Sequence, residues 1–401
     1  MTIPLIIYRS LRQHALSTLV TAASIALACG LLMTVWMVKA QSQRAFMETS
    51  TGFDGVLGAR GSELQIVLNS IFHLEASPGN IKVSDYEQIK KHPAVKTAVP
   101  IATGDNYRGW RIVGTASEMF TGVAYAGGKK YEMAQGKIFS DGEHAHEAVV
   151  GSFAAAQLGL GVGSVFHPSH GLAHASGHEH EEEYRVAGIL APTNTPADRV
   201  IWIPLEGVQH MSGHAESAHS ELSAVLVQLK ARPAGFQLKE YYKRGERLTF
   251  AYPATAIIAD FFNKIGWFDR VLALVAFVVA LVAAGSVLAS VYASMSERQR
   301  DIAILRALGA RRGTVFSTLM LEAMVICALG AVCAFAVYFA LMTGVTELIR
   351  EQTGVVISIM AWHPVLLWCP LGMIALGAFG GIVPAVKAYR VPVAETLSPL
   401  S

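Results

Sequence analysis

Residues 296–312 read SERQRDIAILRALGARR, and this charged stretch lies between two apolar runs that are each long enough to cross a bilayer. Its charged residues alternate with Ile302, Ile304, Leu305 and Leu308 at roughly helical spacing. That spacing predicts an amphipathic helix, which lies on a membrane surface or against a partner protein. A cytoplasmic loop anchored by arginines has a similar composition, so the rest of the chain has to decide between the two.

The overall composition is that of a membrane protein. Of 401 residues, 52% are hydrophobic and only 15% are charged, whereas a soluble domain carries about 25% charged residues. The net charge of +2 offers no basic surface to a nucleic acid, so nucleic-acid binding is not expected. All four cysteines lie in apolar runs, which predicts small buried side chains and no disulfide framework.

Four apolar runs predict four transmembrane helices. They cover residues 15–38, 271–295, 316–345 and 365–386. Basic residues precede the first run, fill residues 296–312 and follow the last run at Lys387 and Arg390. Because positively charged loops stay in the cytoplasm, we expect both termini and residues 296–312 to be cytoplasmic. The long polar segment after the first run is then exoplasmic.

This polar segment, residues 39–267, is long enough to form a domain with its own core. Alternating and β-branched stretches predict strands, and longer periodic stretches predict helices. The strands are expected at 111–113, 148–150, 184–190, 200–203 and 224–229, and the helices at 83–91, 153–158 and within 237–259. The predicted fold class is an α-helical membrane protein with four transmembrane helices (1 + 3) and a large mixed α+β exoplasmic domain inserted between the first and the second.

Two separated motifs in the last part of the chain resemble those of a known family. Residues 297–310, ERQRDIAILRALGA, followed by LEA at 321–323, are similar to the hallmark of the MacB/FtsX-type (type VII) ABC transporter permeases. Residues 384–397, PAVKAYRVPVAETL, look like the closing motif of that family. The two motifs stand in the family's order on the family's topology.

The exoplasmic segment is similar to the family's periplasmic core domain in three short stretches. These are GKIF at 136–139, EAVVG at 147–151 and LGLGVGS at 158–164, whereas residues 166–183 depart from the pattern. The resemblance implies three domains: residues 1–44 with the first transmembrane helix, 45–265 as a MacB-like periplasmic core domain, and 266–401 as an FtsX-like domain.

The resemblance also implies a non-catalytic permease subunit in the bacterial inner membrane, surrounded by lipid. Residues 296–312 become a coupling helix that docks into an ATPase, and its expected coupling residues are Glu297, Arg298, Asp301, Arg306 and Leu308. The chain has no G-x-x-x-x-G-K-[ST] loop, so ATP is expected on a separate ATPase chain and no cofactor on this one. Permeases of this family pair, which implies a dimer, most simply a homodimer, with two ATPase subunits. The family relays ATP-driven closure to its periplasmic domain, which is called mechanotransmission.

Histidine is the other unusual feature. Of 14 histidines, all but His14 and His363 lie in the polar segment, and many stand beside glutamates between residues 143 and 183. Imidazoles with carboxylates are the usual ligand set of zinc and also suit nickel and copper(II). The candidate ligands are His144, His146, His170, His174, His178 and His180, and His210 with His214 is a second candidate pair.

Glycines in the His-rich segment at 166–183 predict a mobile loop that captures metal reversibly. A merely solvated loop, or one that changes charge with pH, is the alternative interpretation. The leading functional hypothesis is therefore a permease linked to transition-metal handling, with zinc as the metal and a periplasmic metal-binding or adaptor protein as a further partner.

Two other functions fit the same topology. One is export or membrane extraction of a lipoprotein, peptide or antibiotic, with the histidines incidental. The other is transmembrane activation of a periplasmic hydrolase. A membrane metallohydrolase is the least favoured function, because the sequence has no H-E-x-x-H motif.

Overall fold

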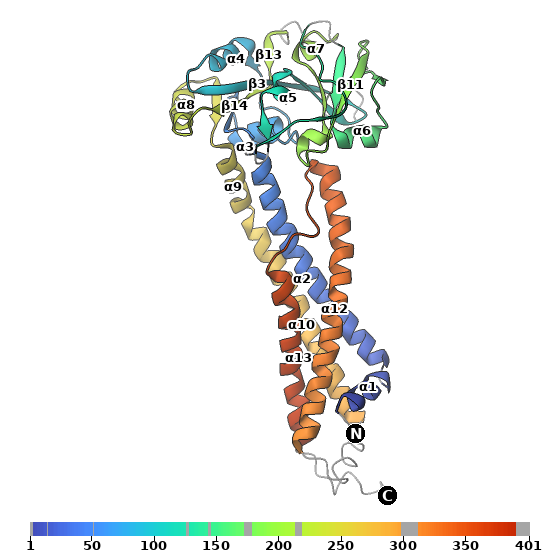
Figure 1. Ribbon diagram of the computed structural model, residues 1–401. Helices are drawn as coiled ribbons and strands as arrows, with labels where there is room; N and C mark the ends of the chain where they lie inside the picture. Colours follow the sequence, from blue (N-terminus) through green and yellow to red (C-terminus); the bar gives the residue numbers. More distant parts are fainter. Residues whose placement is uncertain are drawn as a thin grey trace, which may run out of the picture. The chain divides into compact units, whose positions relative to one another are not determined.

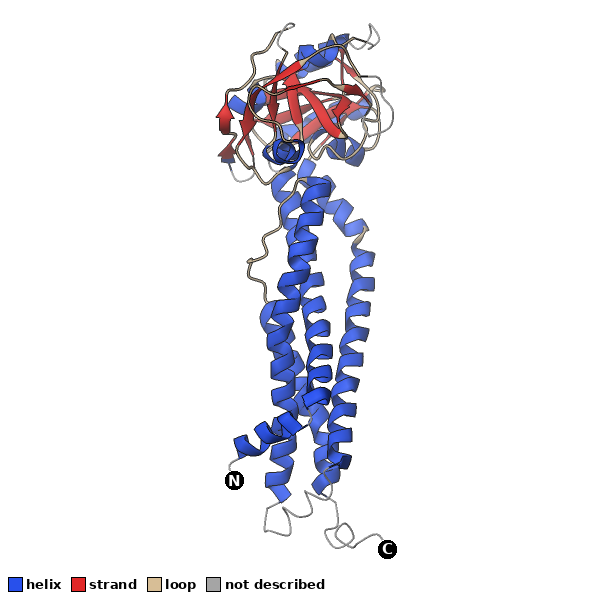
Figure 2. Ribbon diagram, turned by 90° about the vertical axis from the view of Figure 1, so that its right-hand side faces the viewer, coloured by secondary structure: helices blue, strands red, loops and turns tan. Residues whose placement is uncertain are grey.

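The computed structural model describes residues 3–13, 15–50, 52–125, 128–142, 146–171, 179–212, 219–297 and 312–389. The chain divides into two compact units. Unit 1 contains Met1–Gln41, Gly266–Thr346 and Ser358–Ser401, and unit 2 contains Ser42–Ile265 and Glu347–Ile357. Unit 1 is helical, and unit 2 is built around a β-sheet (Figure 1, Figure 2).

Long apolar helices form most of unit 1. Its elements are α1 (Ile3–Gln13), most of α2 (Ala15–Ser50), α10 (Gly266–Glu297), most of α12 (Arg312–Thr353) and α13 (Val365–Tyr389). Among the described residues, α2 and α12 contain apolar stretches long enough to cross a bilayer, whereas those in α10 and α13 are shorter. A helix is therefore present at each of the four predicted positions, and the crossing of the membrane by all four stays a prediction.

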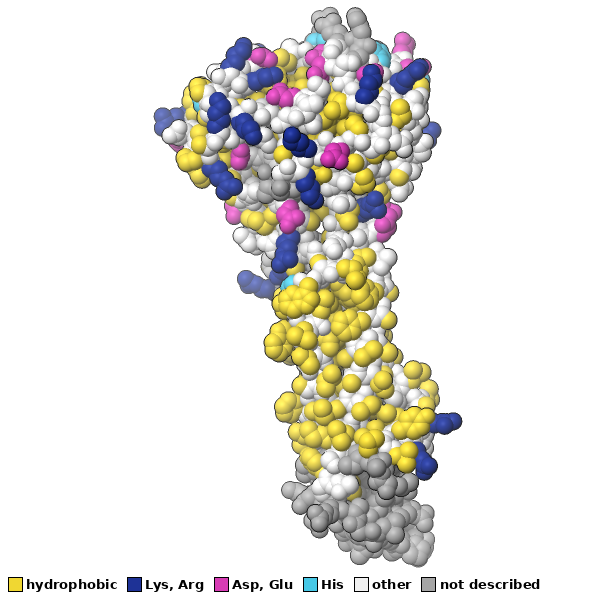
Figure 3. Space-filling view, in the orientation of Figure 1, with side chains coloured by type: hydrophobic (Ala, Val, Ile, Leu, Met, Phe, Trp, Pro, Cys, Tyr) yellow, Lys and Arg dark blue, Asp and Glu magenta, His cyan; other side chains and the backbone are white. Residues whose placement is uncertain are grey.

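The surface of these helices is apolar. Figure 3 shows hydrophobic side chains gathered over them, and large exposed side chains include Leu19, Phe277, Val332, Trp368 and Phe379. A contiguous apolar surface of this kind is rare on soluble proteins. It suits contact with hydrocarbon, where a helix satisfies its own backbone hydrogen bonds.

Glycines allow α2 and α12 to approach each other closely. A Cβ atom added to Gly330 of α12 would lie 2.7 Å from the Cβ of Ile25 and 2.9 Å from the carbonyl oxygen of Ala22. A Cβ added to Gly30 of α2 would lie 2.7 Å from the Cβ of Val337. Small residues are the usual contact points between membrane helices, because apolar burial alone does not drive their association in lipid.

Two further contacts join helices of unit 1. The Sγ atoms of Cys29 in α2 and Cys369 near the start of α13 lie 3.1 Å apart, and both cysteines are free thiols. The hydroxyl of Ser10 in α1 donates a hydrogen bond to the buried carboxylate of Glu322 in α12. An acidic group among apolar helices needs such a polar partner.

Eleven strands of the described part of unit 2 form one mixed sheet (Figure 2). Nine of them follow the order β15 (Leu248–Ala251), β1 (Gly55–Ala59), β14 (Ala224–Leu229), β3 (Val95–Tyr107), β4 (Trp110–Thr115), β12 (Ile201–Pro204), β8 (Glu147–Val150), β11 (Tyr184–Leu190) and β7 (Met133–Gly136). β10 (Ser169–His170) pairs with β3, and β9 (Val165–Phe166) pairs with β11. β12 runs parallel to β4, and β11 runs parallel to β8.

Helices and short strands surround this sheet. They are α3 (Glu63–Ser70), β2 (Ile81–Lys82), α4 (Val83–Lys90), α5 (Glu118–Thr121), β5 (Ala124–Tyr125), β6 (Lys129–Lys130), α6 (Ser152–Leu158), η2 (Pro196–Arg199), α7 (Leu205–Gln209), β13 (Glu221–Leu222), α8 (Pro233–Arg244) and α9 (Ala254–Lys264).

The sheet is buried on both faces. Ile112 and Ile201 belong to one apolar cluster, and their chain neighbours Val113 and Trp202 belong to another. Because successive residues of a strand point to opposite faces, each central strand needs two adjacent apolar residues to serve both clusters. This explains the continuous apolar runs from which several of these strands were predicted.

The last turns of α2 and α12 pack within unit 2. Phe46 of α2 stacks on Phe72, with 5.1 Å between ring centroids, and contacts Phe262 of α9 edge-on. The guanidinium of Arg350 near the end of α12 lies 4.7 Å from the ring centre of Phe153 in α6. Each of these two helices thus contributes residues to both units.

The strands predicted at 184–190 and 224–229 match β11 and β14 residue for residue, and the other three predicted strands lie within or overlap β4, β8 and β12. The long strand β3 was not predicted, because Pro100, Gly104 and Asn106 interrupt its apolar pattern with residues typical of turns. β1, β7 and β15 were also missed.

Replacing Gly330 with alanine should destabilise the protein by about 1–3 kcal/mol, because the added methyl group overpacks the contact between α2 and α12. Gly344 in the same helix is the matched control, since a Cβ there meets nothing within 4 Å. The Gly344→Ala variant should be neutral or more stable. The midpoint of thermal unfolding in detergent measures both variants, and equal midpoints for the two would contradict the close packing.

Candidate functional site

A bulge in strand β3 turns one carboxylate toward the interior of unit 2. Thr103 pairs with Val113 and Asp105 pairs with Ile112, so Gly104 is an extra residue in the ladder. Such a bulge moves the following side chain to the other face of the sheet. Asp105 therefore shares the face of buried Ile112, and its side chain is 0% exposed.

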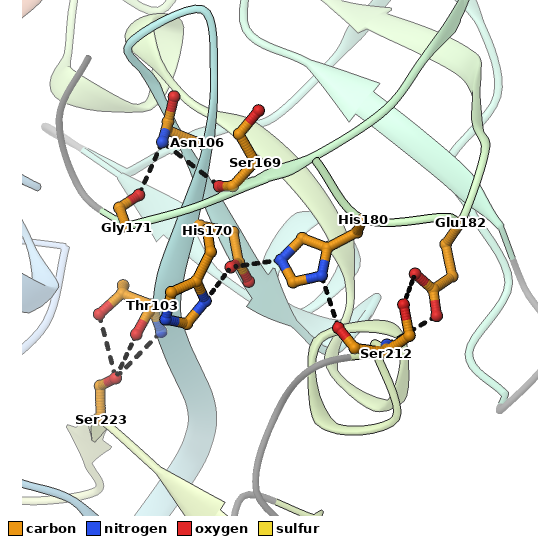
Figure 4. Close-up of polar contacts among 10 residues, drawn as sticks. Thr103, Asn106, Ser169, His170, Gly171, His180, Glu182, Ser212 and Ser223 are labelled. Atoms are coloured by element: carbon orange, nitrogen blue, oxygen red, sulfur yellow. Dashed lines mark hydrogen bonds and ion pairs between the residues drawn. The ribbon is translucent and has the colours of Figure 1, made fainter. Parts of the chain in front are cut away.

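Strand β10 brings His170 directly opposite Asp105. The antiparallel register pairs His170 with Asp105 and Ser169 with Asn106. The amide of Asn106 donates hydrogen bonds to the carbonyl oxygens of Ser169 and Gly171, at 3.3 and 2.8 Å, and Figure 4 shows these bonds. The N–H of Gly171 donates to the carbonyl of Gly104 at 2.8 Å.

The chain returns to the same place at His180. Glu179 forms a β-bridge with Ser169, and the N–H of His180 donates to the carbonyl of Pro168 at 2.8 Å. The His180 ring is 5% exposed. Its ring centre lies 5.9 Å from that of His170.

Asp105, His170 and His180 together form a cluster of possible metal ligands, which we call the His–Asp cluster. The Oδ1 atom of Asp105 lies 3.1 Å from Nε2 of His180 and 3.4 Å from Nδ1 of His170. The three ligand atoms all lie within 4.8 Å of one another. The His170 side chain is 59% exposed, so solvent reaches the cluster from its side.

A second layer of polar groups holds His180 in position. Nδ1 of His180 lies 2.6 Å from the carbonyl oxygen of Ser212. The N–H and the hydroxyl of Ser212 donate to the two carboxylate oxygens of Glu182, at 2.7 and 2.8 Å (Figure 4). Burial raises the pKa of Glu182, but the hydrogen bonds from Ser212, with smaller contributions from its own backbone and from His180, outweigh burial, and the net pKa is lowered. Glu182 is therefore an anion at neutral pH.

The structure brings together two of the six predicted histidine ligands and places one elsewhere. His146 stacks on Tyr184, with ring centroids 5.3 Å apart, and its Nδ1 lies 3.3 Å from the carbonyl oxygen of Glu183. His144, His174 and His178 lie outside the described residues. His210 of the second candidate pair contacts His219 at 4.8 Å between ring centres, and His214 also lies outside the described residues.

Asp105 was missed by sequence reasoning, since strand β3 itself was missed. The signal available was a short polar stretch, Gly104-Asp105-Asn106, at the end of an apolar run. Of the predicted coupling residues, Arg298, Asp301, Arg306 and Leu308 lie outside the described residues. Glu297 is the last residue of α10.

A small pocket lies elsewhere in unit 2. Its lining is mostly apolar and aromatic and includes His73, Tyr131 and Trp202. The ring of His73 meets Trp202 edge-on at 5.3 Å. Burial, with a smaller contribution from the charge of Arg111, lowers the pKa of His73 to about 3. His73 is therefore neutral at physiological pH.

Two protein families match this chain, one in its first part and one in its last part. Residues 15–237, more than half of the chain, match the family described as MacB-like periplasmic core domain. Residues 273–393 match the family described as FtsX-like permease C-terminal. The chain belongs to the MacB/FtsX-type ABC transporter permeases. The resemblance that the two C-terminal motifs indicated is thus confirmed.

A relative of this MacB/FtsX-type permease is the macrolide export ATP-binding/permease protein MacB of Sodalis glossinidius (strain morsitans). It is 24% identical over 226 residues, which are 53% of this chain and 33% of the relative. The matched region thus spans about a third of the relative's length.

Two solved structures are also similar to the permease. The periplasmic region of MacB from Actinobacillus actinomycetemcomitans is 13% identical, with a TM-score of 0.35, and covers 54% of this chain and 95% of that one. The extracellular domain of the noncanonic ABC-type transporter YknZ from Gram-positive bacteria is 15% identical, with a TM-score of 0.29, and covers 49% of this chain and 98% of that one.

The low pKa of His73 predicts a loss of stability of the permease in acid. Below pH 6.5 the unfolded chain binds a proton at His73, whereas the folded chain does so only near pH 3. Within this window, each unit by which the pH falls lowers the free energy of unfolding by at most about 1.4 kcal/mol. Unfolding of a His73→Asn variant should therefore depend less on pH, by about 2 kcal/mol between pH 6.5 and 4.5.

Asparagine suits this position because it tolerates the positive φ of 54° found at His73. The control is His92→Asn, since His92 is an exposed histidine of the same unit. Denaturant midpoints of the full chain across the pH range measure the effect. Parallel profiles for the native chain and His73→Asn would show that the ring is not held neutral by burial.

Proposed function

We propose that this chain is the non-catalytic permease subunit of an ABC transporter in the bacterial inner membrane. Its membership of the MacB/FtsX-type permeases carries the proposal. In it, a separate ATPase dimer hydrolyses ATP, two permease chains pair in the membrane, and residues 296–312 dock into the ATPase from the cytoplasmic side. The absence of a Walker A loop from the 401 residues supports a partner ATPase.

The work done by ATP hydrolysis is movement of the periplasmic domain. The arrangement of α2 and α12 supports this mechanotransmission, because each is one continuous helix whose last turns are packed within unit 2. A helix is held by hydrogen bonds along its whole length, so a displacement of one end moves the other. Phe46 at the end of α2 contacts Phe72, and Arg350 at the end of α12 contacts Phe153, so these contacts attach the two helices to the rest of unit 2.

The process that this movement serves handles a transition metal, with zinc as the preferred ion. The His–Asp cluster supports this part of the proposal, because two imidazoles and a carboxylate are a zinc-type ligand set. A soluble metal-binding protein of the periplasm is then a further partner. Export of a small molecule is the second candidate, since the related MacB protein is named for macrolide export.

Replacing Leu308 with aspartate should disrupt docking of the ATPase, because it places a charge among the apolar residues that the sequence predicts to lie on one face of a helix. We expect at least tenfold weaker binding, or about 1.4 kcal/mol, and a matching loss of permease-stimulated ATP turnover. Co-purification and ATPase assays in nanodiscs measure both. Lys243→Glu, at an exposed position of α8, is the control, and an intact complex with Leu308→Asp would show that docking lies elsewhere.

A Phe46→Ala/Arg350→Ala double variant removes both contacts. It should keep its ATP turnover, but the periplasmic domain should no longer respond to ATP. Arg44→Ala and Glu351→Ala form the matched control, since both residues are exposed on the same two helices. Hydrogen exchange in unit 2 with and without ATP measures the response. A response that persists in the double variant at full size would rule out transmission through these contacts.

A further inference from the structure

Both ring nitrogens of His180 face atoms that only accept hydrogen bonds. A neutral imidazole can satisfy one of these two atoms, so the other needs a positively charged partner. Its Nδ1 faces the carbonyl oxygen of Ser212, and its Nε2 faces the carboxylate of Asp105. A carbonyl and an ionised carboxylate only accept hydrogen bonds, and a neutral imidazole has only one N–H to donate. We assign that proton to Nδ1, because its carbonyl partner is the nearer of the two acceptors, at 2.6 Å against 3.1 Å. The lone pair of Nε2 then points at Asp105.

The same oxygen of Asp105 also faces a second imidazole. Nδ1 of His170 lies 3.4 Å from Oδ1 of Asp105. Three electron-rich atoms thus lie within 4.8 Å of one another, on one exposed and two buried side chains. A divalent cation in contact with the three atoms satisfies all of them at once.

The distances suit a transition metal of the size of zinc. Bonds of about 2.0–2.1 Å to a tetrahedral ion place neighbouring ligand atoms roughly 3.3 Å apart. The two distances from Asp105 Oδ1, 3.1 and 3.4 Å, bracket this value. Of the three side chains, the exposed His170 is the one that is able to move to complete the geometry.

The hydrogen-bond partners of His180 are of the kind that metal-bound histidines usually have. Such a histidine usually donates its other ring N–H to a carbonyl or carboxylate, which fixes the ring and makes the ligating nitrogen more basic. In this chain the Ser212 carbonyl takes that place, and Glu182 holds Ser212 through two hydrogen bonds. His180 is therefore oriented before any ion binds.

We propose that Asp105, His170 and His180 form a binding site for a divalent transition-metal ion of the zinc class, with a fourth position open to water or to a donor delivered by a partner. The bound ion joins the bulge of β3 to both ends of the segment between Gly171 and Glu179. This inference rests on the metal-handling part of the proposed function. The experiment measures metal binding and not transport. The metal site and the proposed transport function can therefore fail independently.

The test uses the full chain in lipid nanodiscs, purified without a histidine tag and stripped of metal with a chelator. Zinc chloride is titrated against a competing zinc dye, with magnesium and calcium chloride as comparison ions. We expect zinc binding tighter than millimolar and none of magnesium or calcium, because two imidazoles disfavour these ions. His170→Ala, which removes an exposed side chain, should weaken zinc binding at least tenfold.

Two further variants test the interior of the site. Asp105→Asn keeps the shape of the buried side chain and removes its charge, and should also weaken zinc binding at least tenfold. Glu182→Gln should weaken it by roughly ten- to a hundredfold through His180. Thermal unfolding without metal shows whether each variant is folded. If Asp105→Asn does not fold, the zinc affinity of His170→Ala decides the test.

His146→Ala is the matched control, since His146 is exposed in the same unit and lies outside the cluster. Zinc should also slow hydrogen exchange of the Gly171 amide in the native chain and not in His170→Ala. Millimolar or weaker zinc binding would overturn the proposal. Zinc binding lost in a His174→Ala/His178→Ala variant but kept in Asp105→Asn and His170→Ala would overturn it as well.

Discussion

The continuity of α2 and α12 is the constraint on which the rest of the molecule depends. Each helix starts in the helical unit and ends among the side chains of the sheet unit. Gly30 and Gly330 let the two helices lie in close contact, as small residues do between membrane helices. Phe46 and Arg350 then join this pair to aromatic side chains of the sheet unit. In the proposed mechanotransmission, the sheet unit moves as one rigid body.

That rigidity follows from burial on both faces of the sheet, and the His–Asp cluster depends on it. A carboxylate with no exposed surface is costly unless polar or cationic groups surround it. Asp105 has this position only because Gly104 adds a residue to β3 and turns the next side chain inward. The neighbouring Asn106 uses its amide to hold β10 in register. One irregularity in one strand thus fixes both the buried ligand and the strand that carries the exposed one.

Sequence patterns predicted the long apolar helices and five of the strands, because these depend on the local length and pattern of apolar residues. Tyr184–Leu190 and Ala224–Leu229 were predicted over their full length. β3 was not found, since its turn-type residues serve a bulge and a hairpin whose need appears only when the strands pair. His170 and His180 were named from composition, but their meeting with Asp105 depends on a register between segments about 65 to 75 residues apart in sequence. The final turn of α12 likewise gives no sign in sequence that it packs in the sheet unit.

The three residues of the His–Asp cluster come from two different kinds of segment. His170 and His180 both lie in residues 166–183, whereas Asp105 lies on strand β3. All three residues fall within the match to the MacB-like periplasmic core domain. A binding function is commonly added to an existing fold in this way, through a variable segment held by a fixed scaffold. In the proposed function, α2 and α12 transmit the movement, and His170, His180 and Asp105 hold the metal. These two roles use different residues, so loss of His170 and His180 would remove metal binding and leave the contacts of Phe46 and Arg350 in place.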